Sequence, residues 1–351
     1  MTYQRYGKDL SEGALRMGDE LDGATIQLLI PSKHGGGVHD LASILQREMG
    51  AEAVKLVPLS MDNVADWRVN AGDTVMLHMS GYEYSRRGTA IWLLREIAAR
   101  RPEMRRFGVF FHELYAFGPP WGSTFWVSAV QRHVVRRLAE MSDFWMTNRE
   151  GSAQWLNRYA AGKPYHVAPV FSNVGELATP SSRRKKRAVV FGTPGLRTNT
   201  YRAAGAELFL WAKAQSIEIH DIGTPLTDPQ IKIVLDDAGV IQHGRMDAGD
   251  ISDLLVDTQF GILAYPISFV AKSGVFAAFC AHGVCPVLFS KQYEPADGLF
   301  AGQQYLASFP SEVGIGDEMK AVARNAWEWY QPHNVAEHIS SFRELLGIAA
   351  G

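Results

Sequence analysis

Cysteine is scarce in this chain. Cys280 and Cys285 are the only two, and both lie in one apolar segment, so a disulfide scaffold is excluded and a reducing compartment is favoured. No run reaches the ~18 apolar residues of a transmembrane helix, and the N-terminal stretch lacks the apolar core of a signal peptide. We therefore expect a cytoplasmic protein.

Charge of one sign is also lacking. The formal net charge is -2, which leaves no global field to draw the molecule onto nucleic acid, and no nucleic-acid motif occurs. Hydrophobic residues make up 46% of the chain and charged residues 21%, which is typical of a folded globular protein. A length of 351 residues is large for one core and favours two domains.

Short apolar strands alternate with amphipathic helices along the chain. After the strand expected at 24–31, Val38, Leu41, Leu45 and Met49 recur at helical spacing. Strands separated by helices of this length indicate parallel sheets. The sequence thus predicts α/β architecture with two tandem Rossmann-like, doubly wound domains. Two domains of this class commonly face each other across a cleft.

The domain boundaries follow from a polar, Pro/Ser-containing stretch. We expect an N-terminal domain at 1–171, a linker at 172–187, a second domain at 188–325, and C-terminal helices at 326–351 that pack back toward the N-terminal domain. The basic run Arg183–Arg187 is interpreted as a solvated tether, with anion binding as the alternative.

In open α/β sheets, ligands bind at the carboxyl ends of strands, where helix N-termini present N–H groups. Three glycines, Gly35, Gly36 and Gly37, follow the first strand. They match neither the dinucleotide nor the P-loop fingerprint. They predict a loop that faces substrate, and a flexible turn is the alternative.

His112 and Glu113 follow another apolar strand. A histidine there can be a general base, an orienting donor or a structural hydrogen-bonding group. Tyr115 and Trp121 belong to the aromatic loop that comes next, which is interpreted as an acceptor platform or, alternatively, as core packing.

Basic residues follow two strands of the second half. Gly192 and Thr193 precede Arg197 and Arg202, whose guanidinium groups suit a diphosphate, although surface arginines are common. The motif Lys272–Gly274 opens an apolar helix, where an anion would feel both a lysine and the helix dipole. The alternative is a capped buried helix whose lysine reaches solvent.

Arginines also cluster in the first half, around Trp92, Leu93 and Leu94. This pattern would suit an anionic lipid or an anionic acceptor, and a solvated helix face is the alternative. The arginines are Arg86, Arg87, Arg95, Arg100, Arg101, Arg105, Arg106, Arg132, Arg136 and Arg137.

The order of these motifs resembles that of GT-B glycosyltransferases. "GGGVHDLASILQREMGA", "FHELY" and "VVFGTPGLR" are similar to segments of the retaining family-4-type enzymes (glycosyl transferases group 1), as is "VIQHGRMDAGDISDLLVDTQFGILAYP". "AKSGVFAAFCAHGVCPVL" resembles the helix start of the peptidoglycan GlcNAc transferase. The resemblance covers roughly residues 24–350.

This resemblance implies metal-independent transfer of a hexosyl group from a UDP, GDP or dTDP sugar to a glycan, lipid-linked or small-molecule acceptor, without a cofactor, as in bacterial-type polysaccharide biosynthesis. His112 and Glu113 would be catalytic, and Tyr115 and Trp121 would bind the acceptor. Donor-binding residues would be Gly35, Gly36, Gly37, Gly192, Thr193, Arg197, Arg202, His243, Arg245, Tyr265, Lys272, Ser273 and Gly274.

Three positions depart from the resembled enzymes. Val270 and Ala278 stand where the retaining family carries paired glutamates, and Cys280 stands where the peptidoglycan enzyme carries a ribose-binding glutamate. The stereochemistry of transfer is therefore not carried over. Two other functions stay open: a non-catalytic nucleotide-sugar or partner-binding protein on a degenerate GT-B scaffold, and a sugar-nucleotide epimerase.

Overall fold

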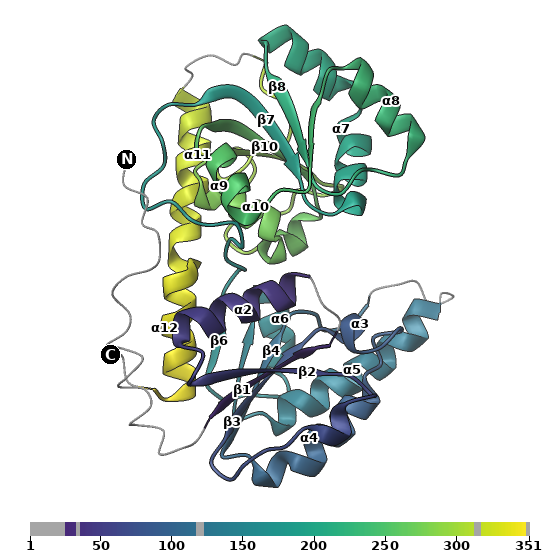
Figure 1. Cartoon of the computed structure of the whole chain (residues 1–351), viewed down its shortest axis with the longest axis vertical. Coiled ribbons are helices and arrows are strands. Elements are labelled where there is room, and N and C mark those ends of the chain that lie inside the picture. Colours follow the sequence, from purple (N-terminus) through teal and green to yellow (C-terminus); the bar gives the residue numbers. More distant parts are fainter. Residues whose placement is uncertain (1–24, 33–35, 117–122, 312–316, 349–351) are drawn as a thin grey trace. The chain divides into compact units, whose positions relative to one another are not determined.

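The computed structural model describes residues 25–32, 36–116, 123–311 and 317–348, and these form two compact units (Figure 1). The N-terminal unit comprises the described residues up to Ala168 and those from His338 onward. The C-terminal unit is Pro169–Glu337. Each unit contains one parallel sheet between helices, so the predicted α/β class is confirmed.

The sheet of the N-terminal unit has the order β2-β1-β3-β4-β5-β6, and every neighbouring pair is parallel. Strands β2 and β3 lie on opposite sides of β1, so a topological switch point falls between β1 and β3. The strands are β1 (Ile26–Pro31), β2 (Val54–Leu59), β3 (Thr74–Met79), β4 (Arg106–Phe111), β5 (Phe144–Thr147) and β6 (Tyr165–Val167). The helices are α2 (Gly37–Met49), α3 (Gly81–Tyr84), α4 (Ile91–Arg100), α5 (Ser123–Met141), α6 (Glu150–Leu156) and most of α12 (Val335–Leu346), with 3-10 turns η1 (Val64–Asp66) and η2 (Arg101–Glu103).

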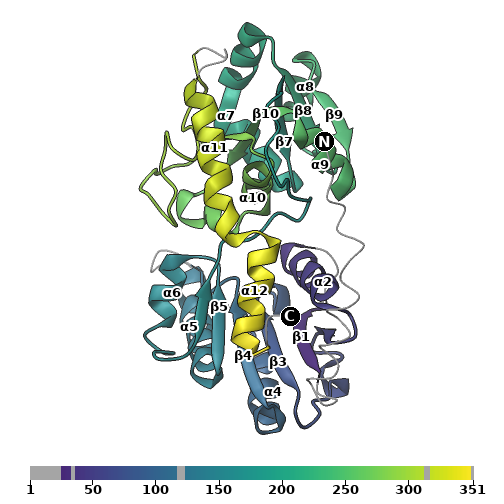
Figure 2. The same ribbon diagram turned by 90° about the vertical axis from the view of Figure 1, so that its left-hand side faces the viewer.

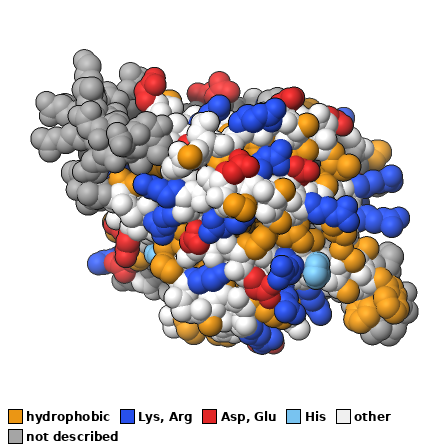
Figure 3. Space-filling view, turned by 90° about the horizontal axis from the view of Figure 1, so that it is seen from below, with side chains coloured by type: hydrophobic (Ala, Val, Ile, Leu, Met, Phe, Trp, Pro, Cys, Tyr) orange, Lys and Arg blue, Asp and Glu red, His pale blue; other side chains and the backbone are white. Residues whose placement is uncertain are grey.

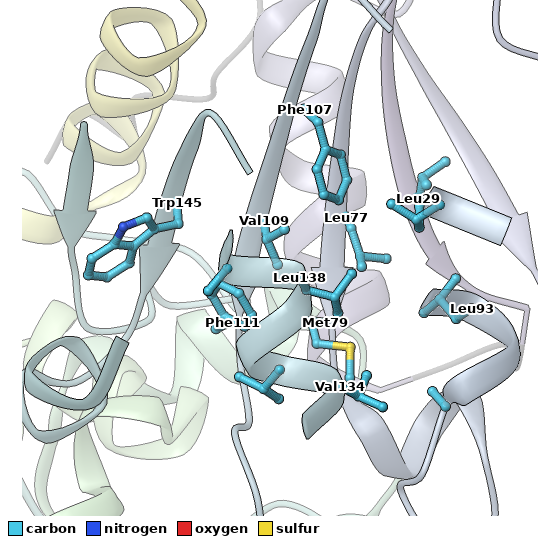
Figure 4. Close-up of a cluster of buried hydrophobic side chains, with 14 of the residues drawn as sticks. Leu29, Leu77, Met79, Leu93, Phe107, Val109, Phe111, Val134, Leu138 and Trp145 are labelled. Atoms are coloured by element: carbon cyan, nitrogen blue, oxygen red, sulfur yellow. The ribbon is translucent and has the colours of Figure 1, made fainter. Parts of the chain in front are cut away.

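Both faces of this sheet are covered, which explains why its strands are almost continuously apolar. On one face, Val109 and Phe111 belong to a buried cluster with Leu93 of α4 and Leu138 of α5 (Figure 4). On the other face, Phe342 of α12 lies beside Phe110, with ring centroids 6.0 Å apart (Figure 2 shows α12 against the strands). The alternation of strand side chains therefore separates two packed layers.

The sheet of the C-terminal unit has the order β11-β10-β7-β8-β9, again all parallel, with its switch point between β7 and β10. The strands are β7 (Lys185–Phe191), β8 (Glu218–Ile222), β9 (Ile241–Gly244), β10 (Thr258–Ala264) and β11 (Cys285–Phe289). The helices are α7 (Pro194–Gln215), α8 (Pro229–Asp237), α9 (Ala248–Val256), α10 (Gly274–Ala281) and α11 (Asp317–Tyr330), with 3-10 turns η3 (Ile267–Lys272) and η4 (Gln331–His333).

Helix α10 packs closely on this second sheet. Phe279 stands edge-on to Phe191 of β7, with centroids 5.4 Å apart. A Cβ at Gly261 of β10 would lie only 2.4 Å from the Phe279 ring, so glycine is needed there for the ring to reach the strand. On the opposite face, Val190 and Ile262 pack in one buried cluster with Leu208 of α7. The close seat of α10 places its N-terminus at the carboxyl edge of the sheet.

The basic run expected to be a solvated tether is partly structural. Strand β7 already begins at Lys185, inside the stretch predicted as linker. The Arg184 guanidinium donates to the carbonyls of Val256 and His282 at 3.1 and 2.8 Å. Burial lowers the pKa of Arg184 to about 10. This correction arises because carbonyls at the ends of α9 and α10 need donors that the chain supplies from this run.

No helix in the described ranges combines the length and the apolar character needed to cross a membrane.

A substitution in β4 tests the packing beneath the candidate site. A Cβ at Gly108 would lie 2.1 Å from the Phe144 ring of β5, so Gly108→Ala is expected to overpack the sheet and cost about 1–3 kcal/mol or more. Gly151→Ala in α6 is the matched control, because nothing lies within 4 Å of its added Cβ. Urea unfolding followed by circular dichroism should show a lower midpoint for the first variant only. Equal midpoints would contradict the packing of β4 on β5.

Candidate functional site

The glycine loop of the N-terminal unit lies at its topological switch point. Gly36, with φ 121°, precedes α2 and follows β1. A Cβ on Gly36 would lie 3.4 Å from Oε1 of Glu83, which belongs to α3 directly after β3. Gly37 opens α2, and Gly35 lies outside the described residues. The loops after β1 and β3 therefore meet at one edge.

His112 and Glu113 lie at the same edge, after β4. The His112 amide donates to the Met79 carbonyl at 3.0 Å, and its ring stacks on Phe110 with centroids 4.1 Å apart. Ser80, which follows β3, donates through its hydroxyl to Oε2 of Glu113 at 3.4 Å. Both predicted residues are half-buried, and the strand ends position them together.

A second histidine stands behind His112. His78 of β3 is fully buried, and its Nδ1 lies 3.1 Å from Nε2 of His112. Burial lowers the pKa of His78 to about 3, so its imidazole is neutral. His78 was not among the residues predicted from the sequence. The one signal for it is a histidine near the end of the otherwise apolar run Thr74–Met79.

Of the two predicted acceptor residues, Tyr115 and Trp121, the structure describes only Tyr115. The half-buried ring of Tyr115 lies under the Arg132 guanidinium, 4.4 Å from its centroid, and against Trp155 of α6 at 5.3 Å. Trp121 lies outside the described residues. An acceptor contact by either residue stays a prediction.

In the C-terminal unit, two helix N-termini lie side by side. Gly192, with φ 124°, follows β7, and a Cβ there would lie 3.2 Å from Val275 in the first turn of α10. Thr193 caps α7 by accepting from the Leu196 amide, and Ser273 caps α10 by accepting from the Phe276 amide. The ends of β7 and β10, which flank the switch point, thus carry two capped helix starts.

Lys272 and Gly274 flank the second cap. Lys272 is half-buried, and its ammonium group lies 5.8 Å from the centroid of the Phe269 ring. A Cβ on Gly274 would approach Oδ1 of Asn173 at 3.6 Å, so Asn173, which belongs to the stretch predicted as linker, lies near this helix start. Tyr265 follows β10, where its amide donates to the Phe289 carbonyl at 3.0 Å. The structure therefore groups Gly192, Thr193, Lys272, Ser273 and Gly274 around α7 and α10.

Arg197 has a different position from the predicted one. Its side chain is fully buried and forms an ion pair with Asp221 of β8. The same guanidinium donates to the Thr224 carbonyl and, at 3.2 Å, to the Gly192 carbonyl. The predicted diphosphate contact is therefore replaced by a structural role, because the guanidinium turns inward and ties the loops after β7 and β8 together.

The remaining predicted donor residues lie toward strands β8 and β9, away from the switch point between β7 and β10. The exposed Arg202 pairs with Asp228 at 2.7 Å. His243 belongs to the edge strand β9, where its Nε2 lies 2.8 Å from Nδ1 of His220 in β8. Arg245 follows β9 and is exposed.

The chain segments that follow β7, β8 and β9 nevertheless contact one another. A Cβ at Gly223 would lie 2.5 Å from the Gly192 carbonyl oxygen, and the Gly223 amide donates to the Gly244 carbonyl at 2.8 Å. Gly223 therefore lets the β7 and β9 loops approach the same backbone.

The structural role of Arg197 has a direct test. Arg197→Met should lower the free energy of unfolding by about 3–5 kcal/mol, because it leaves the buried Asp221 carboxylate without its positively charged partner. Arg202→Met removes an exposed pair and should change stability little. Chemical denaturation of both variants gives the comparison. An Arg197→Met protein as stable as wild type would show that the guanidinium does not hold these loops.

No protein-family model matches the chain, and no curated protein matches its sequence. Solved structures do match. The pneumococcal O-GlcNAc transferase GtfA, in complex with UDP and GlcNAc, has a TM-score of 0.54 at 12% identity and covers 82% of this chain. The match takes up 58% of the GtfA chain, so this chain spans little more than half the length of that protein.

Two further structures match over nearly their whole length. The lipopolysaccharide outer core galactosyltransferase WaaB, in its apo form, has a TM-score of 0.54 at 11% identity, covering 92% of this chain and 99% of that one. A putative UDP-N-acetylglucosamine 2-epimerase from Listeria monocytogenes has a TM-score of 0.50 at 9% identity, covering 92% and 96%. With its two parallel α/β units, the chain has the GT-B glycosyltransferase fold that the sequence predicted.

Proposed function

We propose that the protein is a hexosyltransferase-type enzyme that transfers a sugar from a nucleotide-diphosphate sugar to a glycan, lipid-linked or small-molecule acceptor. The observation that carries this proposal is the pair of capped helix starts of α7 and α10, with Lys272 beside them. The GT-B fold supports it, since both matched transferases carry names for sugar transfer.

The chemistry follows from the helix starts. The first amides of a helix lack partners within it, and the dipole favours negative charge there. A diphosphate near Gly192 and Ser273 would meet two such termini and the Lys272 ammonium group. Charge that develops on a departing diphosphate would be stabilised by these fixed groups. We propose that the reaction needs no metal ion and no cofactor for this reason.

The N-terminal unit is proposed to bind the acceptor. Its carboxyl edge presents His112 and Glu113, and the Gly36–Gly37 loop at this edge is still proposed to bind the donor. Glu113, which accepts a hydrogen bond from the Ser80 hydroxyl, is proposed to take a proton from an acceptor hydroxyl if the reaction inverts configuration.

Two observations favour other functions on the same scaffold. Val270, Ala278 and Cys280 have no carboxyl group, so the carboxylates that the resembled enzymes carry at these positions are missing. A non-catalytic nucleotide-sugar binding protein would have this property. The epimerase match favours the second alternative. Turnover of a panel of UDP-, GDP- and dTDP-sugars separates the three, since transfer, epimerised product and binding without turnover are distinct results.

Calorimetric titration with UDP and GDP tests the diphosphate site. Lys272→Ala should weaken binding about tenfold, equivalent to about 1.4 kcal/mol, because a charge next to the diphosphate is lost. Lys232→Ala is the matched control, since Lys232 is an exposed lysine of α8. Unchanged affinity in Lys272→Ala, or an equal loss in both variants, would refute the assignment of Lys272.

We also propose peripheral contact with the cytoplasmic face of an anionic membrane, through α5. The apolar residues predicted to accompany the clustered arginines at the surface do not form such a surface, because Leu93 is buried and Trp92 and Leu94 pack against the core. Trp126 and Phe125 replace them, since 70% and 41% of their surfaces are exposed at the start of α5. Exposed cations follow along the same helix, namely Arg132, Arg136 and Arg137. Figure 3 shows many Lys and Arg side chains on the lower face of the N-terminal unit, with apolar side chains at one corner.

Vesicle sedimentation tests this contact. Wild type should bind vesicles that contain phosphatidylglycerol more strongly than pure phosphatidylcholine, and less so at high salt, because exposed charges are screened. Trp126→Ala should weaken binding several-fold through loss of an interfacial anchor. Leu210→Ala removes a similarly exposed side chain (69%) from α7 and should have no effect. Binding that ignores lipid charge or Trp126 would overturn the proposal.

A further inference from the structure

His78 is a buried titratable group that the proposed chemistry does not use. Its ring lies between the layers of the N-terminal unit, 5.6 Å from Phe110 and 6.5 Å from Phe342 between centroids. Its Nδ1 faces Nε2 of His112 at 3.1 Å. Among the described residues, its Nε2 has no hydrogen-bond partner. One nitrogen of His78 is thus paired, and the other is buried without a partner in the part of the chain that the structure describes.

This asymmetry determines where the proton of His78 resides. A neutral imidazole carries one N–H and one lone pair, so one of the two nitrogens must donate and the other accept. A buried N–H without an acceptor is rarer in proteins than an under-used acceptor, and each unmet buried donor costs the full desolvation of that group. The proton therefore belongs on Nδ1, where it is donated to His112, and the bare lone pair belongs on Nε2.

The tautomer of His112 follows from that of His78. Because Nε2 of His112 accepts this hydrogen bond, a neutral His112 must carry its proton on Nδ1. We propose that His78 is a positioning residue that holds His112 in the Nδ1–H tautomer, so that His112 offers a substrate oxygen a hydrogen-bond donor and does not serve as a base. The part that concerns substrate rests on the proposed function.

The same pairing also disfavours a charged His112. An imidazolium at His112 would direct an Nε2–H at His78, which would then have to accept through Nδ1 and move its own proton to Nε2. That nitrogen is buried without a hydrogen-bond partner among the described residues, so the shift would leave a donor unmet. The backbone bond from the His112 amide to Met79 and the stack on Phe110 hold the ring against His78. Of the roles open to His112 from sequence, the orienting donor is the one that this geometry favours.

Nitrogen-15 NMR of the histidine-labelled full chain reads the tautomers directly, because protonated and bare ring nitrogens have well-separated shifts. In wild type we expect His112 to show a protonated Nδ1 and a bare Nε2, and His78 to show the same pattern. Signals are assigned by their loss in His112→Gln and His78→Phe.

Two variants separate positioning from packing. His78→Phe keeps a ring beside Phe110 and Phe342 but removes the donor, so the His112 signals should move to a mixture of tautomers. His78→Asn can place an amide N–H near the position of Nδ1 and should keep the wild-type tautomer of His112. If turnover is found, KM of the substrate that His112 contacts should rise several-fold in His78→Phe and less in His78→Asn.

A protonated Nε2 on wild-type His112, or an unchanged His112 spectrum in a folded His78→Phe protein, would overturn the inference. These readouts need no activity. If no nucleotide sugar is bound or turned over, the proposed function fails, whereas the assignment of tautomers by His78 is still decided by the spectra.

Discussion

Both candidate regions depend on one constraint of parallel sheets. Parallel strands joined by right-handed crossover helices all have their carboxyl ends at one edge of the sheet. Where the strand order reverses, the loops after two neighbouring strands run in opposite directions and leave a crevice between them. In this protein the reversals lie between β1 and β3 and between β7 and β10. Every grouped candidate residue lies in a loop or first helical turn at one of these edges. The chemistry is therefore placed by topology before any single side chain contributes.

Within that constraint, buried polar groups shape the loops. In the C-terminal unit, Arg197 joins the backbone after β7 to the backbone after β8, and Tyr201 donates to the same Asp221 carboxylate at 2.8 Å. Burial raises the pKa of Asp221, so its charge there depends on the guanidinium. With Arg197 in this structural role, the helix starts and Lys272 are the groups left to bind the anion in the proposed donor site. In the N-terminal unit, His78 has a comparable supporting place behind His112.

Capping and periodicity were readable from the sequence because they are local. Ser273 caps α10, which is the feature that the capped-helix alternative expected, and β1 and α2 fall where the apolar run at 24–31 and the helical spacing after it indicated them. The direction of a long charged side chain cannot be read from local sequence. It depends on whether a residue elsewhere in the chain places an opposite charge within reach. Arg197 and Arg202 are five residues apart on one helix, yet one is buried against Asp221 and the other is exposed with Asp228. Nothing in their spacing distinguishes them.

The sequence by itself determined the two α/β units, the glycine and cap residues at helix starts, and the absence of carboxylates at Val270, Ala278 and Cys280. These depend on hydrophobic period and on residue identity. Only the tertiary structure decided that His78 and His112, 34 residues apart, share a hydrogen bond, and that Gly192 lies against Val275. Such pairs form when neighbouring strands bring their ends together, and contacts of this kind leave no trace in local sequence spacing.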